Sequence, residues 1–147
     1  MSHTYVQNVV HVVFSTRERQ RMIPKEFQPR MWSYIAGICK HQRFFVHAIG
    51  GMEDHVHGLI QVPAAVSLAD VVLAIKSNSS RWANEQGHKF AWQKGYGAFS
   101  VSKSSEIQVL EYIKGQEAHH RKRTFKDEFL TLLEKHEIEY DERYLWD

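Results

Sequence analysis

Cysteine and proline are both scarce in this chain of 147 residues. A single cysteine, Cys39, excludes an internal disulfide and a zinc site built from several thiolates. Three prolines and eight glycines are too few for a collagen-like or disordered repeat. No apolar run approaches the roughly 20 residues that a membrane-spanning helix needs, and the first residues lack the charged-then-apolar pattern of a signal peptide. We therefore expect a cytoplasmic, soluble protein.

Linkers and common nucleophile motifs are missing as well. No repeat, low-complexity tract or Ser/Gly/Pro-rich linker interrupts the chain, so residues 1–147 are predicted to form one domain. No G-x-S-x-G turn, phosphate-binding P-loop or G-x-G-x-x-G occurs. Cys39 lies among apolar residues of a predicted helix, where a buried and unreactive thiol is the usual case.

The charges are distributed unevenly, although the formal net charge is only +2. Residues 1–126 carry 17 Lys and Arg against 9 Asp and Glu, a net charge of +8. Residues 127–147 carry 2 against 8, a net charge of −6. A basic body suggests an anionic partner, most often nucleic acid, and the alternative is an ordinary basic protein with an acidic terminal helix. Charge alone leaves both interpretations open.

Hydrophobic periodicity predicts the order strand, helix, strand, strand, helix, strand, helix, helix. The strands are expected at 5–15, 43–49, 55–62 and about 98–101, and the helices at 24–42, 67–86, 105–122 and 125–136. Ser67 and Ser105 are the expected N-caps of two helices, and Gly50 to Asp54 the loop of a hairpin. This order indicates an α+β fold, close to the ferredoxin-like (RRM-like) arrangement with one four-stranded antiparallel sheet. We expect the helices on a single face of that sheet.

The motif His55-Val56-His57 lies on a predicted strand. Because side chains alternate along a strand, both imidazoles project from one face. Two adjacent imidazoles can hold one divalent cation and leave open positions for water or a substrate oxygen. Asp54 adds a carboxylate, although an Asp at a loop end is more often a turn residue. In a chain with ten histidines this motif also arises by chance, so it does not assign a metal site alone.

Tyr112 and Gln116 lie four residues apart on a predicted C-terminal helix and so share one face. Gln116 can supply an oxygen ligand to a hard cation such as Mg²⁺, and the Tyr112 hydroxyl beside it can act as a nucleophile. An ordinary phenol titrates near pH 10, so it needs a metal or a base to react at neutral pH. The alternative is a core tyrosine beside a solvated glutamine.

Several basic and aromatic residues are candidate contacts to nucleic acid. Such basic runs are more often solvated helix ends, and such aromatic residues are more often core. The predicted contacts are Lys76 and Arg81 on the second helix, Lys94 and Tyr96 in the glycine-broken segment, and Lys114, Arg121, Lys122 and Arg123 around Gln116. Trp92 and Phe99 are further aromatic candidates in the same glycine-broken segment.

Four blocks in this order resemble a known family, the single-tyrosine HUH transposases of the smallest insertion sequences, insertion sequence family 200/605. The blocks are Val9 to Thr16, Asp54 to His57, Trp92 to Val101 and Tyr112 to His120. The similarity extends from about residue 5 to residue 129. The family's ferredoxin-like fold agrees with the strand order predicted above.

The resemblance implies a DNA strand transferase that acts on single strands folded into hairpins at the ends of the element. His55 and His57 match the family's histidine pair and Gln116 its third ligand, together binding Mg²⁺ or Mn²⁺. Tyr112 matches the nucleophile, which forms a 5′-phosphotyrosine and frees a 3′-hydroxyl. A 3′-hydroxyl of a second strand then resolves the link. Storing the bond in a phosphotyrosine makes the reaction reversible without ATP.

The resemblance also implies a homodimer in which the tyrosine helix serves the partner's histidine pair. Gly115 stands where the family more often has Asn. A relative lineage acts on chromosomal repetitive palindromes and has longer or more basic tails than this acidic C-terminus, so it ranks second. Two other classes stay open: a non-catalytic single-stranded nucleic-acid-binding protein, and a hydrolytic metalloenzyme that uses His55, His57 and Asp54.

Overall fold

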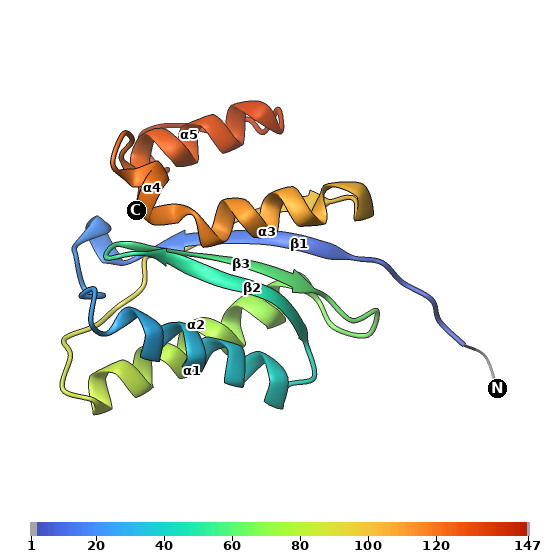
Figure 1. The fold of residues 1–147 in the computed structure, drawn as a ribbon, viewed down its shortest axis with the longest axis horizontal. Coiled ribbons are helices and arrows are strands. Elements are labelled where there is room, and N and C mark those ends of the chain that lie inside the picture. The colour runs from blue at the N-terminus through green and yellow to red at the C-terminus, as the bar shows by residue number, and fades with distance from the viewer. Residues whose placement is uncertain (1–2, 147) are drawn as a thin grey trace.

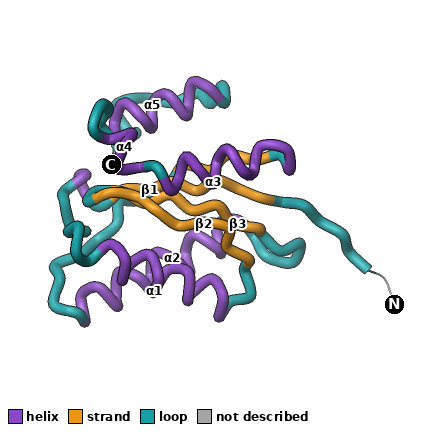
Figure 2. Tube along the Cα trace, viewed as in Figure 1, coloured by secondary structure: helices purple, strands orange, loops and turns teal. Residues whose placement is uncertain are grey.

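The computed structural model describes residues 3–146 and contains a four-stranded antiparallel sheet with helices on it (Figures 1 and 2). The strand order is β2-β3-β1-β4. The strands are β1 (Val9–Ser15), β2 (Phe45–Met52), β3 (His55–Gln61) and β4 (Gly97–Val101). The helices are α1 (Gln28–His41), α2 (Leu68–Glu85), α3 (Glu106–Lys114), α4 (Gln116–His120) and α5 (Phe125–Lys135), with short 3₁₀ helices η1 (Arg17–Arg19) and η2 (Lys103–Ser105). The predicted α+β fold class is confirmed.

No helix among residues 3–146 is both long and apolar enough to cross a bilayer.

The expectation that all helices cover one face of the sheet is wrong. Helices α1 and α2 lie on one face, and α3, α4 and α5 lie on the other (Figure 1). The reason is in β1, which is buried at all seven positions. Val10, Val12 and Phe14 face α1 and α2, while Val9 and Val13 join cores on the other face. A strand that is apolar on both sides needs cover on both sides.

Three local predictions also need correction. The helix expected from Ser105 to Lys122 is divided at Gly115 into α3 and α4, and the Ser105 side chain makes no capping hydrogen bond. The Ser67 hydroxyl does cap α2, since it accepts from the Asp70 backbone N–H at 3.0 Å. The hairpin loop is shorter than expected, because β2 continues through the two glycines to Met52.

Gly50 allows α3 to lie directly against β2. A Cβ atom at Gly50 would lie 2.7 Å from the backbone oxygen of Ile113, one residue after Tyr112. That approach is closer than a carbon and a backbone oxygen tolerate, so a side chain here must displace α3. The bare backbone of Gly50 therefore sets the height of α3, and with it the position of Tyr112, above the sheet.

Replacing this glycine should be costly, and an open glycine offers the control. We expect Gly50→Ala to lower the free energy of unfolding by about 1–3 kcal/mol, as overpacking does. Gly37 lies within α1, and a Cβ atom there would meet nothing within 4 Å beyond its own helix backbone. Gly37→Ala should instead raise stability by about 0.5–1 kcal/mol, because it restricts the unfolded chain and favours helix. Urea unfolding of both variants checks this, and equal effects would contradict the close approach.

Candidate active site

The histidine pair lies on the face of the sheet that α3, α4 and α5 cover, near the start of β3. His55 and His57 both project from β3 to this side, as strand alternation predicts, and both are fully buried. The Tyr112 ring meets the His57 ring edge-on, with centroids 5.8 Å apart. The Gln116 side chain is also buried, with its Oε1 atom 2.9 Å from His55 Nε2. All four residues predicted to form the site therefore meet in one chain.

A carboxylate that the sequence motifs do not include joins them. Glu128 of α5 is 2% exposed, and its Oε1 atom accepts hydrogen bonds from His57 Nε2 at 3.0 Å and His120 Nε2 at 3.1 Å. His55 Nε2 lies 3.4 Å from the same oxygen. One carboxylate oxygen is therefore shared by three imidazoles from β3 and α4.

The other oxygen of Glu128 faces the predicted nucleophile. Oε2 accepts a hydrogen bond from the Tyr112 hydroxyl and another from the Gln116 side-chain amide at 3.1 Å. The break at Gly115 does not separate Tyr112 from Gln116, because the Gly115 N–H still donates to the Glu111 carbonyl at 2.9 Å. The i to i+4 relation survives across two short helices, and both side chains reach the same carboxylate.

Outer partners fix the orientation of both histidine rings. The His55 Nδ1 atom lies 2.7 Å from Asp54 Oδ1, which directs Nε2 into the cluster. The His57 Nδ1 atom lies 2.8 Å from Nε2 of the buried His11. Since His57 Nε2 donates to Glu128, its Nδ1 must accept, and His11 Nε2 carries the proton between them. Asp54 and His11 thus each hold the far nitrogen of one histidine.

The pKa values of the histidines differ because their partners differ. Burial alone would lower the pKa of His55, but its hydrogen bonds to Asp54 and Glu128 outweigh burial and raise the pKa to about 9. Burial lowers the pKa of His57 despite the opposing pull of Glu128. Burial and then the neighbouring His57 lower the pKa of His11 to about 3. Of these three rings, His55 is therefore the cationic one, and His57 and His11 are neutral.

The pKa values of the two oxygen acids move in opposite directions. Burial would raise the pKa of Glu128, but hydrogen bonds from His120, His55 and His57 lower it well below its usual range. Burial and the hydrogen bond to Glu128 raise the pKa of Tyr112 well above that of an ordinary phenol. Without a bound metal ion, the cluster therefore holds an ionised Glu128 and a protonated Tyr112.

The donor set fits a hard divalent cation. One ligand atom each from His55, His57 and Glu128 lie within 4.8 Å of one another, and Gln116 Oε1 adjoins them. Two imidazole nitrogens with carboxylate and amide oxygens suit Mn²⁺ and can serve Mg²⁺, whereas thiolates, which select softer metals, are absent from this cluster.

Sequence reasoning missed Glu128 and His11, although both left a signal. The charge pattern places Glu128 only within an acidic C-terminal part. Yet Phe125 and Phe129 flank it at helical spacing, so it lies within the buried stripe of α5. His11 likewise interrupts the apolar run of β1. A charged or titratable residue at a core position needs a hydrogen-bonding partner. The positions of Glu128 and His11 within apolar patterns therefore indicate a buried polar cluster.

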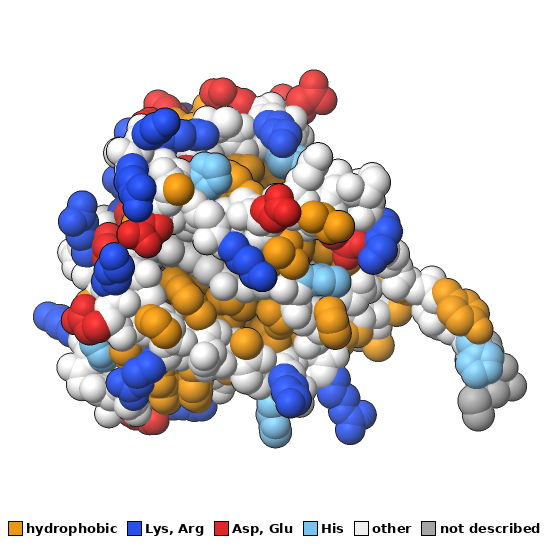
Figure 3. Space-filling view, viewed as in Figure 1, with side chains coloured by type: hydrophobic (Ala, Val, Ile, Leu, Met, Phe, Trp, Pro, Cys, Tyr) orange, Lys and Arg blue, Asp and Glu red, His pale blue; other side chains and the backbone are white. Residues whose placement is uncertain are grey.

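The predicted DNA contacts fall into two groups on different sides of the sheet. Lys76 and Arg81 lie on α2, and the Lys76 ammonium donates to the Gln93 carbonyl at 2.8 Å and to the Gly95 carbonyl. Burial lowers the pKa of Lys76 to about 8. Lys94 and Tyr96 follow in the exposed loop before β4. The second group is Lys114, Arg121, Lys122 and Arg123, all exposed around α4, on a side of the molecule where Figure 3 shows basic side chains with acidic ones among them.

The aromatic candidates divide in the same way. The Trp92 ring packs edge-on against Phe14 at 4.8 Å, and its Nε1–H donates to the Ser79 hydroxyl at 2.9 Å. Phe99 is 2% exposed, whereas Tyr96 is 39% exposed. Phe99 is a core residue and Trp92 is partly buried against the core, which leaves Tyr96 as the most exposed of these three rings.

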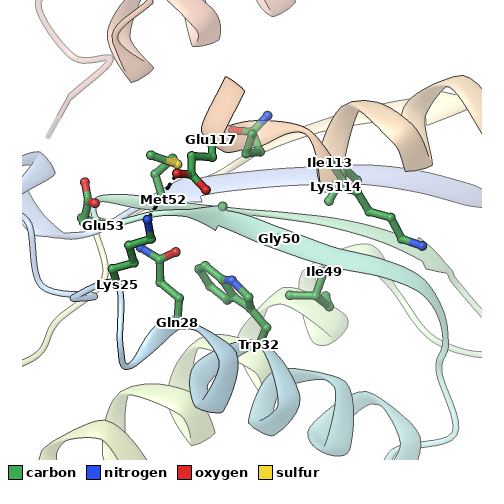
Figure 4. A pocket seen from close by; sticks show the side chains of 12 residues that line it. Lys25, Gln28, Trp32, Ile49, Gly50, Met52, Glu53, Ile113, Lys114 and Glu117 are labelled. Atoms are coloured by element: carbon green, nitrogen blue, oxygen red, sulfur yellow. Dashed lines mark hydrogen bonds and ion pairs between the residues drawn. The ribbon is translucent and has the colours of Figure 1, made fainter. Parts of the chain in front are cut away.

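A cavity of about 350 Å³ borders the cluster from the edge of the sheet (Figure 4). It lies between α1 and α4, with Trp32 and Gln28 on one wall and Gln116 on the other. Across it the Lys25 ammonium pairs with Glu117 Oε1 at 3.3 Å. The cavity reaches Gln116 but does not include Tyr112 in its lining.

The low pKa of His11 predicts that folding stability depends on pH. Below its ordinary pKa of 6.5, unfolded His11 binds a proton that the folded chain does not bind until about pH 3. Stability must therefore fall as the pH falls, by about 2 kcal/mol from this group between pH 6.5 and 5. We expect His11→Gln to remove that part of the dependence in urea unfolding. His41→Gln, on the exposed end of α1, should leave it unchanged, and equal slopes for all three proteins would contradict the assignment.

Comparison with known proteins identifies relatives of this chain. The transposase for insertion sequence element IS200 of Salmonella typhimurium strain LT2 is 23% identical over 124 residues, which covers 79% of this chain and 81% of the relative. The corresponding transposase of Salmonella typhi gives the same values.

Two solved structures share the fold. One is a crystal structure of a protein from Deinococcus radiodurans R1 named as a candidate transposase, with a TM-score of 0.62, 22% identity, and coverage of 79% of this chain and 96% of that one. The other is a REP-associated tyrosine transposase bound to a REP hairpin, with a TM-score of 0.62, 15% identity, and coverage of 82% and 73%. The family model described as "Transposase IS200 like" matches residues 4–116, well over half of the sequence. The chain therefore belongs to the IS200-like transposase family.

Proposed function

We propose that this transposase cleaves and rejoins single-stranded DNA at the hairpin-containing ends of its element, through a 5′-phosphotyrosine on Tyr112. In this proposal His55, His57 and Gln116 hold Mg²⁺ or Mn²⁺, with the Glu128 carboxylate as an additional oxygen donor. The observation that carries it is the meeting of the Tyr112 hydroxyl and the histidine pair on one buried carboxylate. A solved relative bound to a REP hairpin supports a DNA hairpin as the partner. We place the activity in the cytoplasm.

The side chains divide the work of that reaction. Asp54 and His11 hold the far nitrogens of the histidine pair, so that both Nε2 atoms point at the reacting centre. Glu128 accepts the phenol hydrogen bond and so fixes the direction of the Tyr112 oxygen. When bound, the divalent cation supplies positive charge that stabilises the phosphate and the ionised phenol.

The proposal predicts a covalent adduct that requires Tyr112. Wild-type protein mixed with single-stranded DNA from either end of its element and Mn²⁺ should give a shifted band on a denaturing gel. Tyr112→Phe should abolish the band yet keep hairpin affinity within about twofold, because a phenyl ring preserves the packing. A chelator should also abolish it in wild type. Hairpin binding without any adduct would favour the non-catalytic binding protein, and cleavage without an adduct would favour the hydrolytic enzyme.

We also propose a homodimer, for which the family resemblance implies that the tyrosine helix serves the partner's histidine pair. In the single chain Tyr112 lies beside its own histidine pair, so mixing two inactive variants distinguishes the arrangements. Tyr112→Phe and His57→Gln proteins each lack one half of the site. If the helices are exchanged, a mixed dimer regains one complete site and forms adduct on the His57→Gln chain. If each chain uses its own tyrosine, no adduct appears.

The raised pKa of His55 predicts that cation binding strengthens with pH. His55 Nε2 must lose its proton before it can bind a metal, and its pKa is about 9. The dissociation constant for Mn²⁺ should therefore fall by about tenfold per pH unit between pH 7 and 8. Asp54→Asn removes the carboxylate that raises this pKa and should flatten the dependence. Calorimetric titration at several pH values checks both, and a pH-independent affinity in wild type would contradict the assignment.

A further inference from the structure

A second and larger cavity opens onto the nucleophile. It is a groove of about 570 Å³ between α3 and α5, with β4 as its floor, and its inner end is formed by Tyr112, Glu128 and His11. Volumes of about 300–1,000 Å³ are typical of sites that hold a small ligand. The groove is therefore large enough for part of a DNA strand but not for a duplex.

This groove offers a direct approach to the tyrosine, because the Tyr112 side chain is part of its lining. The histidine pair itself is fully buried, so a phosphate must reach it past another residue of the cluster. The smaller cavity at the sheet edge reaches Gln116 only, and one of its two lysines, Lys25, is paired with Glu117. The groove between α3 and α5 includes the Tyr112 ring in its lining. It is thus the side from which a phosphodiester can meet the phenol oxygen.

The groove carries positive charge that the fold does not neutralise. Arg123 donates to the Thr131 hydroxyl at 2.7 Å and to the Asp127 carbonyl at 3.2 Å, both uncharged acceptors. Lys135 has no carboxylate within 4.0 Å among the described residues. The one carboxylate in the lining is Glu128, whose charge is already shared by three imidazoles. Two cations therefore face the groove without an anion of their own.

The rest of the lining suits a nucleotide rather than a free anion. Val109 and Leu132 supply apolar surface, while Ser102 and Ser105 offer hydroxyls at the other end. The His136 ring lies against Phe99, with centroids 4.5 Å apart, and this exposed residue lines the groove. Apolar and aromatic surface accommodates sugar and base, and cations accommodate phosphates.

We propose that this groove binds the single-stranded DNA segment next to the scissile phosphate, and that Arg123 and Lys135 contact its backbone phosphates. The proposal rests on the proposed function, since it names the substrate segment that the same site would receive. Arg123 was a predicted DNA contact, whereas Lys135 lies in the acidic C-terminal part that the charge pattern set apart. The groove thus gives α5 a role in binding DNA despite its net negative surroundings.

The test uses binding without chemistry. All variants are made in the Tyr112→Phe background, and the probe is a fluorescent 12-residue oligothymidine measured by anisotropy. We expect Arg123→Ala and Lys135→Ala each to weaken binding by about three- to tenfold and to reduce the salt dependence of log K by about 0.7, the value of one phosphate contact on a single strand. Lys40→Ala, which removes the same charge from α1 on the opposite face, should change neither.

A second pair of variants fills the groove without changing charge. Gln108 lines the groove from α3, and its neighbour Ile107 is 71% exposed and lies outside the lining. Gln108→Trp should weaken oligothymidine binding by at least about fivefold, since a bulky ring excludes the strand, and Ile107→Trp should not. Equal effects of the two tryptophans, or of Lys40→Ala and Lys135→Ala, would overturn the proposal.

The outcome separates this inference from the proposed function. If wild type forms the covalent adduct but the groove variants bind and react as wild type does, the proposal that DNA binds in the groove is wrong and the proposed function is retained. If no adduct forms but the groove variants still lose affinity selectively, DNA binding in the groove is supported and the proposed cleavage through Tyr112 is wrong.

Discussion

One buried carboxylate holds the functional side of this molecule together. Glu128 is 2% exposed, and an ionised carboxylate at such a site is tolerated only when its hydrogen-bonding capacity is filled. Imidazoles from β3 and α4 fill one oxygen, and the Tyr112 phenol with the Gln116 amide fills the other. The hydrogen bonds of Glu128 therefore have two effects: they connect α5 to β3, α3 and α4, and they fix the positions of the site residues.

The two faces of the sheet have separate tasks. The face under α1 and α2 is an apolar core to which Val12, Phe14 and Ile60 contribute, and its polar groups serve the fold, as the Lys76 ammonium does for nearby carbonyls. The face under α3 to α5 carries every titratable group of the candidate site. Gly50 links the two tasks, because it belongs to an edge strand and yet sets how closely the tyrosine helix can approach. A rigid apolar layer on one side thus supports a polar cluster on the other.

The predicted site residues were found because their relations are local. His55 and His57 share a face by strand alternation, and Tyr112 and Gln116 share one by helical spacing, even across the break at Gly115. Each relation involves residues two or four apart, and the structure brings both pairs together. The order of strands and helices along the chain was predictable for a similar reason, since periodicity within each segment indicates its type. The fold class was inferred from that order. The roles of these residues in DNA cleavage remain predictions.

The sequence by itself determined the element types, the hairpin of β2 and β3 and the two residue pairs, because these depend on neighbours along the chain. Only the tertiary structure decided that helices cover both faces, that Glu128 joins the histidines, and that a groove lies beside Tyr112. Those features depend on contacts between segments far apart in sequence: Glu128 lies 71 positions after His57, and His11 lies 46 positions before it. Local sequence patterns indicate that a residue is buried. They do not indicate which distant residue it will contact.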